Sequence, residues 1–393
     1  MLRCARCTLS DRDPAITAVV PAAADDDIDW QLAFDLAGQH GVLPLVYRAL
    51  GGGADLPADA ALRLRREYYG NSLCNLKLDK ELARIAQLLQ REGVPLIVFK
   101  GPLLAVMAYG DLSMRQFTDL DILIHPRDLE RAAVVLMAAG YRPRRYREGA
   151  AAECLAHYSE DEFFDSNRNC LLDLHWELTP DYFPFGPDAD LAWRRAIPVE
   201  ADGVTINTLA PLDLLMFLCA HGVKHGWRNL GWVCDIAALL RCDPALDQRQ
   251  LLAEATRLRC RRMLLLGMLL AHEMVAAPLV PALLAAASND LEVPSLSAQI
   301  RWRMLATVGQ RQGLFQEWIV PLRTIEGRRR QLVYLTGRAL RPTIEDVEFM
   351  RLPRPLYSLY YLLRPCRLAL QQGGRLFHEM PLPGRAAVQK TVR

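Results

Sequence analysis

Two aspartates, Asp119 and Asp121, lie inside the apolar run DLDILI (residues 119–124), where an unpaired carboxylate is costly. Because side chains alternate along a strand, residues two positions apart point to the same face. A third aspartate, Asp173, lies in the run CLLDLHWEL (residues 170–178), which shows a strand-like alternation. Carboxylates on adjacent strands supply the oxygen ligands that Mg²⁺ prefers. The spacing therefore predicts a site for one or two Mg²⁺ ions.

A glycine turn precedes the two aspartates in the chain. The run PLIVF (residues 95–99) predicts a short buried strand, and Lys100 and Gly101 follow it directly. Glycine lets the backbone come close to a phosphate, and the helix predicted from Pro102 offers free N–H groups at its start. Magnesium held by carboxylates commonly binds substrate phosphates and stabilises in-line displacement at phosphorus. The pattern points to phosphoryl or nucleotidyl transfer.

The strands and helices that are needed to position these residues indicate an α/β core with a short mixed sheet. Strands are expected at residues 95–99, 119–124 and 170–178, with helices at 102–109 and 128–139. The helical spacing elsewhere predicts four regions: a flexible leader (1–26), an N-terminal helical region (27–94), the catalytic core (95–200) and a C-terminal helical region (201–393).

Composition narrows the class of protein. The net charge of +2 gives no chain-wide drive towards nucleic acid, and no clear nucleic-acid binding is expected. The charged N-terminus does not resemble an export signal, and the scattered cysteines fit a reduced, cytoplasmic protein. The apolar stretch at residues 263–287 contains a histidine, a glutamate and two prolines, which predicts buried helices rather than a membrane span.

The charge pattern changes near the C-terminus. Between residues 323 and 375 there are eleven arginines and no lysine, and tyrosines lie among them. A solvated helix face covering the core is one interpretation. The others are a surface for an acidic partner and a peripheral contact with an anionic membrane.

The combination of motifs resembles the DNA polymerase β-like nucleotidyltransferase superfamily. It is most similar to an uncharacterised bacterial nucleotidyltransferase family with an L-K-G turn, an R-x-x-x-D-x-D strand, a D-x-H-W strand and an H-x-x-K-H segment. Four stretches of the sequence carry this resemblance: KGPLLAVMAYGDLSMRQFTDLDILI, GYRP, LDLHWEL and HGVKHGWRNLGWVCDIAALL. The resemblance covers roughly residues 28–367.

The resemblance implies a role for each matching residue. Asp119 and Asp121 match the metal-binding pair, Asp173 matches the third carboxylate, and Gly101 matches the glycine of the phosphate turn. The superfamily's usual serine after this glycine is Pro102 here. Proline has no hydroxyl, so the phosphate contact of that serine must come from another residue.

Three basic residues are therefore expected to contact the triphosphate. Lys100 would act as a point charge, and Arg115 would act through its planar fork. Lys224 would reach the phosphates from the helical region.

Each assignment has a structural alternative. The two aspartates of the DLDILI run could cap a strand end or form salt bridges there, Asp173 could pair with Arg115, and Lys100 could be a surface lysine. His175 could orient Asp173 or act as a base for the acceptor, or it could be a packed core histidine.

Two further histidines, His221 and His225, lie four residues apart, on one helix face. This spacing can bind zinc, but the glutamate of the H-E-x-x-H motif is absent, and packing within the helical region is the alternative.

The resulting hypothesis is an Mg²⁺-dependent enzyme that transfers a nucleotidyl or phosphoryl group from an NTP, with ATP as the expected donor. The acceptor would be a hydroxyl of a peptide, sugar or small molecule. The resemblance implies a role in natural-product (lasso peptide) or exopolysaccharide biosynthesis. The alternative is a non-catalytic protein that binds a partner or a membrane surface through its Arg/Tyr-rich C-terminal region.

Overall fold

The computed structural model describes residues 1–9, 28–53, 56–144, 159–185, 189–306 and 315–379 of the 393-residue chain. These residues fall into two compact units. The larger unit comprises the described residues up to 331, and the smaller unit comprises residues 332–379.

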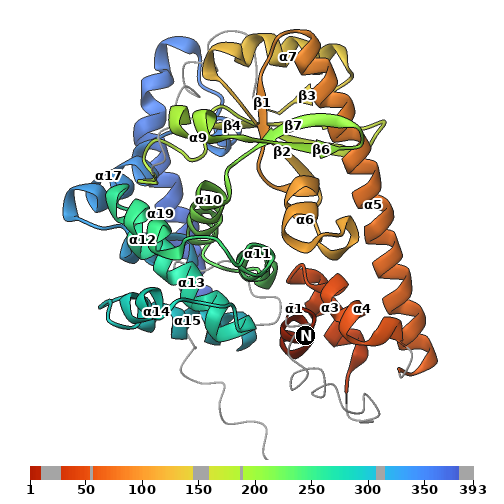
Figure 1. Cartoon of the computed structure of the whole chain (residues 1–393). Coiled ribbons are helices and arrows are strands. Elements are labelled where there is room, and N and C mark those ends of the chain that lie inside the picture. Colours follow the sequence, from red (N-terminus) through yellow and green to blue (C-terminus); the bar gives the residue numbers. More distant parts are fainter. Residues whose placement is uncertain (10–27, 54–55, 145–158, 186–188, 307–314, 380–393) are drawn as a thin grey trace, which may run out of the picture. The chain divides into compact units, whose positions relative to one another are not determined.

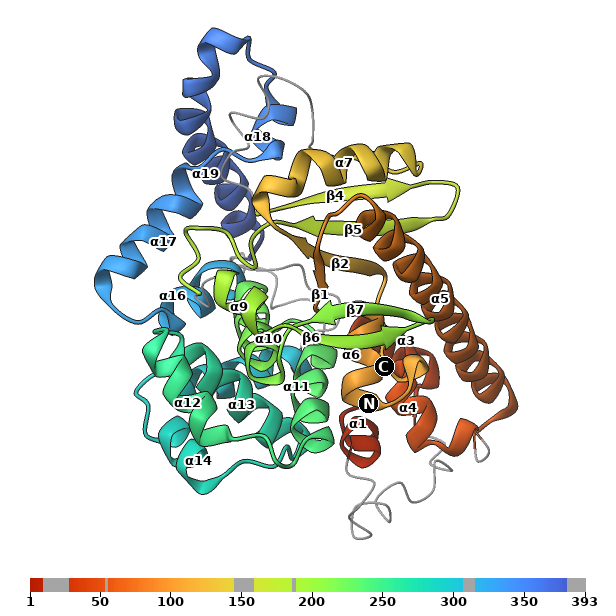
Figure 2. The same ribbon diagram turned by 45° about the horizontal axis from the view of Figure 1, so that its top comes forward.

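A mixed sheet of seven strands forms the larger unit's framework (Figure 1). The strands are β1 (Leu96–Val98), β2 (Asp119–Ile124), β3 (Arg142–Pro143), β4 (Glu160–Asp165), β5 (Cys170–His175), β6 (Ile197–Ala201) and β7 (Val204–Thr208). Their order is β3-β4-β5-β2-β1-β7-β6, and Figure 2 shows β4, β5, β2 and β1 side by side. β2 pairs with β5, and β1 with β7, in parallel, whereas the other neighbours are antiparallel. The chain therefore has the predicted α/β class with a mixed sheet.

The two faces of the central strands differ in character. Leu120, Ile122, Leu172 and Leu174 are completely buried on one face. The residues between them, which include the predicted aspartates, point to the other face. Burial of the leucine and isoleucine side chains stabilises the sheet by about 1.5–3 kcal/mol for each side chain.

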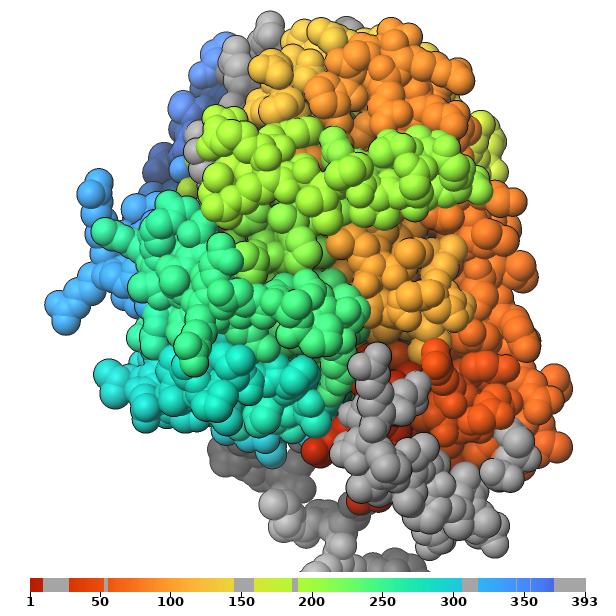
Figure 3. Space-filling model, viewed as in Figure 1, coloured from red at the N-terminus to blue at the C-terminus, as the bar shows by residue number. Residues whose placement is uncertain are grey.

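Helices cover both faces of the sheet. The long helix α5 (Ala58–Arg91) contacts β1, β2 and β7, and α7 (Leu129–Ala138) contacts β3. Figure 1 shows α7 above the strands, with α6 (Gly101–Tyr109) and α10 (Pro211–Lys224) below them. In Figure 3, the yellow-green segment around residue 200 lies on the surface, where β6 forms an edge of the sheet.

The strands and helices that carry the motifs agree with the sequence-based expectations. β1, β2 and β5 lie within the three predicted runs, α6 and α7 match the two predicted helices, and α5 lies within the region 27–94. The sheet nevertheless continues to Thr208, beyond the expected core boundary at residue 200. β4, β6 and β7 were not predicted, because four of the six residues of β4 and three of the five of β7 are polar or charged, and β6 contains a proline, which argues against a strand.

Helices make up most of the described residues between 28 and 94. This segment contains α3 (Trp30–Gln39), α4 (Leu43–Ala49), the 3₁₀ turn η1 (Gly51–Gly53) and α5. The expected flexible leader (1–26) differs at its start, because α1 (Leu2–Leu9) packs against α4. Ala5 is completely buried there, and the Thr8 hydroxyl donates to the Leu45 carbonyl at 2.7 Å. The rest of that leader, from residue 10, lies outside the described residues.

The remainder of the larger unit is helical after β7. After β7 come α10, α11 (Leu230–Cys242), α12 (Gln248–Arg257), α13 (Arg261–Val275), α14 (Pro281–Ser288), α15 (Val293–Ala306), the π-helix η4 (Phe315–Ile319), α16 (Val320–Thr324) and the start of α17 (Arg328–Leu340). One more helix, α9 (Ala189–Arg195), lies earlier in the chain, before β6. The apolar stretch at residues 263–287 forms most of α13 and α14, as predicted. In the described parts of the chain, we find no helix with the length and apolar character needed to cross a membrane.

The smaller unit is built around one buried aspartate. It contains the end of α17, α18 (Ile344–Phe349), the 3₁₀ helix η5 (Arg354–Leu359) and α19 (Tyr360–Glu379). Asp346 is completely buried, and its carboxylate accepts hydrogen bonds from the side chains of Arg364 (3.1 Å) and Arg367 (2.5 Å). Asp346 also completes the capping box at the start of α18 with Thr343. This acid therefore ties α18 to α19.

Candidate active site

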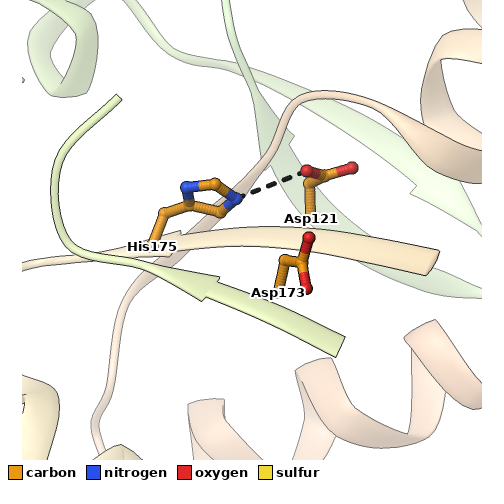
Figure 4. A group of neighbouring side chains, drawn as sticks. All are labelled: Asp121, Asp173 and His175. Carbon is orange, nitrogen blue, oxygen red and sulfur yellow. Dashed lines mark hydrogen bonds and ion pairs between the residues drawn. The ribbon is translucent and has the colours of Figure 1, made fainter. Parts of the chain in front are cut away.

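The register between β2 and β5 places Asp121 beside Asp173. Since the two strands are parallel and these residues are partners, both carboxylates lie on the same face of the sheet. Figure 4 shows them with His175, which follows two residues later on β5 and turns its ring towards Asp121. One ligand atom from each of Asp121, Asp173 and His175 lies within 4.8 Å of the other two. The fold thus brings together two of the three predicted carboxylates and adds an imidazole.

A lysine neutralises Asp121. Lys100 follows β1 as the residue before α6, and its Nζ lies 2.6 Å from Asp121 Oδ1. Both side chains are largely buried. Burial alone would raise the pKa of Asp121, but the nearby charges of Lys100 and His175 outweigh it and lower the pKa to about 2. Lys100 is thus placed at the carboxylates and is not a surface lysine.

His175 joins two acids through its two ring nitrogens. Nε2 lies 3.3 Å from Asp121 Oδ1, and Nδ1 lies 3.1 Å from Glu160 Oε2 on β4. Burial would lower the pKa of His175, but hydrogen bonds to the two carboxylates raise it to about 9. The ring is therefore protonated at neutral pH when these acids are its partners.

Lys224, at the end of α10, extends this arrangement. Its Nζ lies 3.6 Å from Glu160 Oε2. Burial would raise the pKa of Glu160, but Lys224 and His175 hold it well below its usual range. Lys100, Asp121, His175, Glu160 and Lys224 thus form a row of alternating charges, which we call the charge network.

The pKa values of Asp173 and Asp119 are raised, in contrast to those of Asp121 and Glu160. Burial, followed by repulsion from Asp121, raises the pKa of Asp173 to about 7. Burial and the charge of Asp121 also raise the pKa of Asp119. Asp173 Oδ1 is buried and accepts no hydrogen bond within the described chain. Asp119 shares the face of Asp121, but it is not part of the group of ligand atoms that lie within 4.8 Å.

Gly101 adopts a backbone conformation that favours glycine. Its φ is +57°, in the left-handed region, and a Cβ atom there would lie 3.4 Å from the Asp119 carbonyl oxygen. The turn thus brings the start of α6 close to the backbone of β2. The left-handed φ explains why glycine follows Lys100 at the first position of α6.

Arg115 is held by an acid that lies 120 positions later in the sequence. Its Nε donates to both carboxylate oxygens of Asp235 on α11, at 3.1 and 3.2 Å, and the Tyr109 hydroxyl donates to the same carboxylate at 2.8 Å. Arg115 therefore pairs with Asp235 rather than with Asp173, which was the sequence-based alternative. The Arg115 carbonyl also accepts from Asn75 at 2.8 Å. These contacts fix the segment that leads into β2.

His221 and His225 form a packed group of rings. Their centroids lie 4.6 Å apart, and the ring of Trp232 lies 5.0 Å from His221 and 5.6 Å from His225. Burial and the nearby lysines lower the pKa of both histidines, to about 3 for His225. Neither belongs to the ligand group found among the described residues. The geometry fits the packing alternative and gives no support to a zinc site.

Two residues of this region escaped the sequence analysis. Glu160 lies in the run EDEFFD, where three acids precede two phenylalanines, so the run lacks the regular alternation that predicts a strand. Asp235 lies within the apolar helix sequence WVCDIAALL, where a buried acid signals a cationic partner. In both cases the partner comes from a distant element, which the sequence does not identify.

A family model described as an uncharacterised nucleotidyltransferase matches residues 26–276. The chain belongs to this family. The match spans β1 to β7 and includes every residue of the charge network, so this nucleotidyltransferase carries the network within its family region. No curated protein and no solved structure matches the chain.

The chemistry of the Asp121–Asp173–His175 group fits a divalent cation. Two carboxylates and one imidazole are common ligands of such ions, and nucleotidyl transfer commonly needs one. The buried, unpartnered Asp173 Oδ1 supports the fit, because a bound cation would satisfy this oxygen.

Proposed function

We propose that this nucleotidyltransferase moves a nucleotidyl group from an NTP, with ATP as the expected donor, to a hydroxyl group of a peptide, sugar or small molecule. The proposal includes a polymerase β-like core and a divalent cation, for which the sequence predicts Mg²⁺. The observation that carries it is the pairing of Asp121 with Asp173 on one sheet face, beside the Gly101 turn.

The proposed cation would be held by Asp121 and Asp173, with Asp119 close by on the same face. When bound, it would neutralise charge on the triphosphate and on the transferring group. The start of α6 at Gly101 offers backbone N–H groups to a phosphate. Lys100 and Lys224 place two ammonium groups at the ends of the charge network, where each is available to a triphosphate that displaces its acidic partner.

In the proposed reaction, the acceptor oxygen attacks the α-phosphorus and the bond to pyrophosphate breaks. The proton of the acceptor hydroxyl passes to a carboxylate. A carboxylate suits this role better than His175, because the two ring nitrogens of His175 already face Asp121 and Glu160. Transfer of the γ-phosphoryl group remains the second candidate, because a phosphate held by these residues offers more than one phosphorus atom to attack.

Labelled nucleotides separate the two reactions. The full chain would be incubated with Mg²⁺, candidate peptides and glycans, and ATP labelled at either the α- or the γ-phosphorus. We expect the α-label, but not the γ-label, to appear on an acceptor, with release of pyrophosphate. Transfer of the γ-label alone would replace nucleotidyl transfer with phosphoryl transfer. The absence of both labels with every NTP would contradict the proposal.

A further inference from the structure

The third member of the ligand group is an imidazole, where the sequence-based hypothesis had expected a carboxylate. His175 Nε2 lies 3.3 Å from Asp121 Oδ1, and the ring is almost completely buried. Figure 4 shows this nitrogen on the side of the ring that faces Asp121. An imidazole nitrogen is thus placed among the carboxylate oxygens of the proposed cation site.

Glu160 fixes which ring nitrogen faces the carboxylates. Its Oε2 lies 3.1 Å from Nδ1, on the opposite side of the ring from Asp121. In metal-binding histidines a carboxylate commonly lies at the other ring nitrogen, which sets the orientation of the ring. Lys224 holds Glu160 in turn, at 3.6 Å from the same oxygen.

Asp121 does not need His175 for neutralisation. Lys100 already lies closer to the same oxygen, at 2.6 Å compared with 3.3 Å. The neighbouring oxygen of Asp173 is buried without a partner in the described structure. A cation held between Asp173 and His175 would satisfy that oxygen and would replace the proton on Nε2.

We infer that His175 is a ligand of the divalent cation and that Glu160 is the residue that positions it. This inference rests on the cation of the proposed function. A site with an imidazole nitrogen discriminates between metals more strongly than one built from oxygens, since nitrogen ligands favour Mn²⁺ over Mg²⁺. The site should therefore bind Mn²⁺ more tightly than Mg²⁺, although Mg²⁺ was the sequence-based expectation.

Electron paramagnetic resonance of the full chain with Mn²⁺ tests the inference without measuring activity. We expect one bound Mn²⁺ with a hyperfine coupling to a directly bound nitrogen. Growth on ¹⁵N-labelled histidine should change this coupling to the ¹⁵N pattern. The labelled wild-type protein gives this result even where a variant fails to fold.

Variants assign the nitrogen to His175. In His175→Gln, an amide oxygen takes the approximate place of Nε2, so the nitrogen coupling should disappear and the preference for Mn²⁺ over Mg²⁺, measured by competition, should fall. Glu160→Gln should keep the coupling but weaken Mn²⁺ binding by about 10–100-fold. Glu162→Gln is the matched control, because Glu162 lies on the same strand and face, opposite Asp173, but pairs with Arg144 at 2.6 Å, and Mn²⁺ binding should weaken much less than in Glu160→Gln.

The outcomes separate this inference from the proposed function. Bound Mn²⁺ without nitrogen coupling, together with nucleotidyl transfer, would overturn the role of His175 and leave the proposed function standing. The ring would then serve only as a hydrogen-bonded link between Asp121 and Glu160. Failure to bind either ion, together with absence of transfer, would contradict both. Equal weakening of Mn²⁺ binding in Glu160→Gln and Glu162→Gln would remove the positioning role of Glu160.

Discussion

At the scale of single residues, the pairing of Lys100 with Asp121 explains how a carboxylate is tolerated in an apolar strand. Asp121 is almost completely buried, and an ionised acid in that setting needs a cation. The sequence indicated that something positive must meet the aspartates, and it placed Lys100 at the turn. It did not show that the two meet, because β1 and β2 pair only in the folded sheet.

A double-mutant cycle should show this pairing as a large coupling in stability. Lys100→Met should lower the free energy of unfolding by about 3–5 kcal/mol, because it leaves Asp121 buried without its cation. In the background of Asp121→Asn, the same change should cost much less. Urea unfolding of the four proteins gives the coupling energy.

The pair Arg63 and Asp35 is the control for that cycle. Their atoms also lie 2.6 Å apart, but Asp35 is mostly exposed, so its coupling should stay below about 1 kcal/mol. If the coupling of Lys100 with Asp121 were as small as that of the exposed pair, the lysine would not be the partner on which Asp121 depends.

At the scale of elements, the turn between β1 and α6 determines where Lys100 and the helix start lie. The sequence predicted both elements and the glycine between them, since a short apolar run followed by Gly-Pro is a strong local signal. The positive φ of Gly101 and its closeness to the Asp119 carbonyl appear only in the structure.

Replacement of Gly101 by alanine should therefore affect both stability and transfer. Gly110, at the other end of α6, is the matched control, because its φ is +69° but nothing lies within 4 Å of the position that a Cβ atom would take. Both variants should lose about 1–2 kcal/mol of folding free energy from the left-handed backbone. Only Gly101→Ala should also reduce nucleotidyl transfer, since relief of the left-handed strain would shift the turn that carries Lys100 and the start of α6. Equal activity of the two variants would show that the turn does not shape the site.

The difference between local sequence patterns and contacts between distant segments shows how much of the architecture was predictable. Runs with a single strong pattern, such as DLDILI and PLIVF, were predicted within a few residues. Strand β4 was not, because its acids obscure the apolar alternation that a sheet face requires. Glu160 and Asp235 were missed because each acts through a partner from a distant part of the chain, and no local pattern reports such a pairing.

At the scale of the whole molecule, the Arg-rich C-terminal segment includes arginines with internal roles. Arg364 and Arg367 are almost completely buried and bind Asp346 within the smaller unit. Exchange of these two arginines for alanine would therefore disturb folding, and it would not test the alternative function in which this region binds a partner or a membrane.

Stability of the smaller unit should depend on pH through Asp346. Burial would raise the pKa of this acid, but its hydrogen bonds from Arg367 and Thr343 and the charge of Arg364 lower it. Because the folded-state pKa lies below the unfolded value of about 3.9, the stabilisation is complete above that pH and is lost as the pH falls through the folded-state pKa. The difference in unfolding free energy between wild type and Asp346→Asn, measured by urea unfolding, should shrink below about pH 4. A difference that stayed constant from about pH 3 to about pH 7 would contradict the pairing.

The central claim is that the carboxylate face of β2 and β5 carries out cation-dependent nucleotidyl transfer. The most direct test compares Mg²⁺- or Mn²⁺-dependent transfer from α-labelled ATP by wild type, Asp121→Asn and the surface control Asp35→Asn. Loss of a charged ligand should reduce the rate on the order of 10³-fold in Asp121→Asn, while Asp35→Asn stays close to wild type. Transfer by Asp121→Asn within a few-fold of the wild-type rate would contradict the claim.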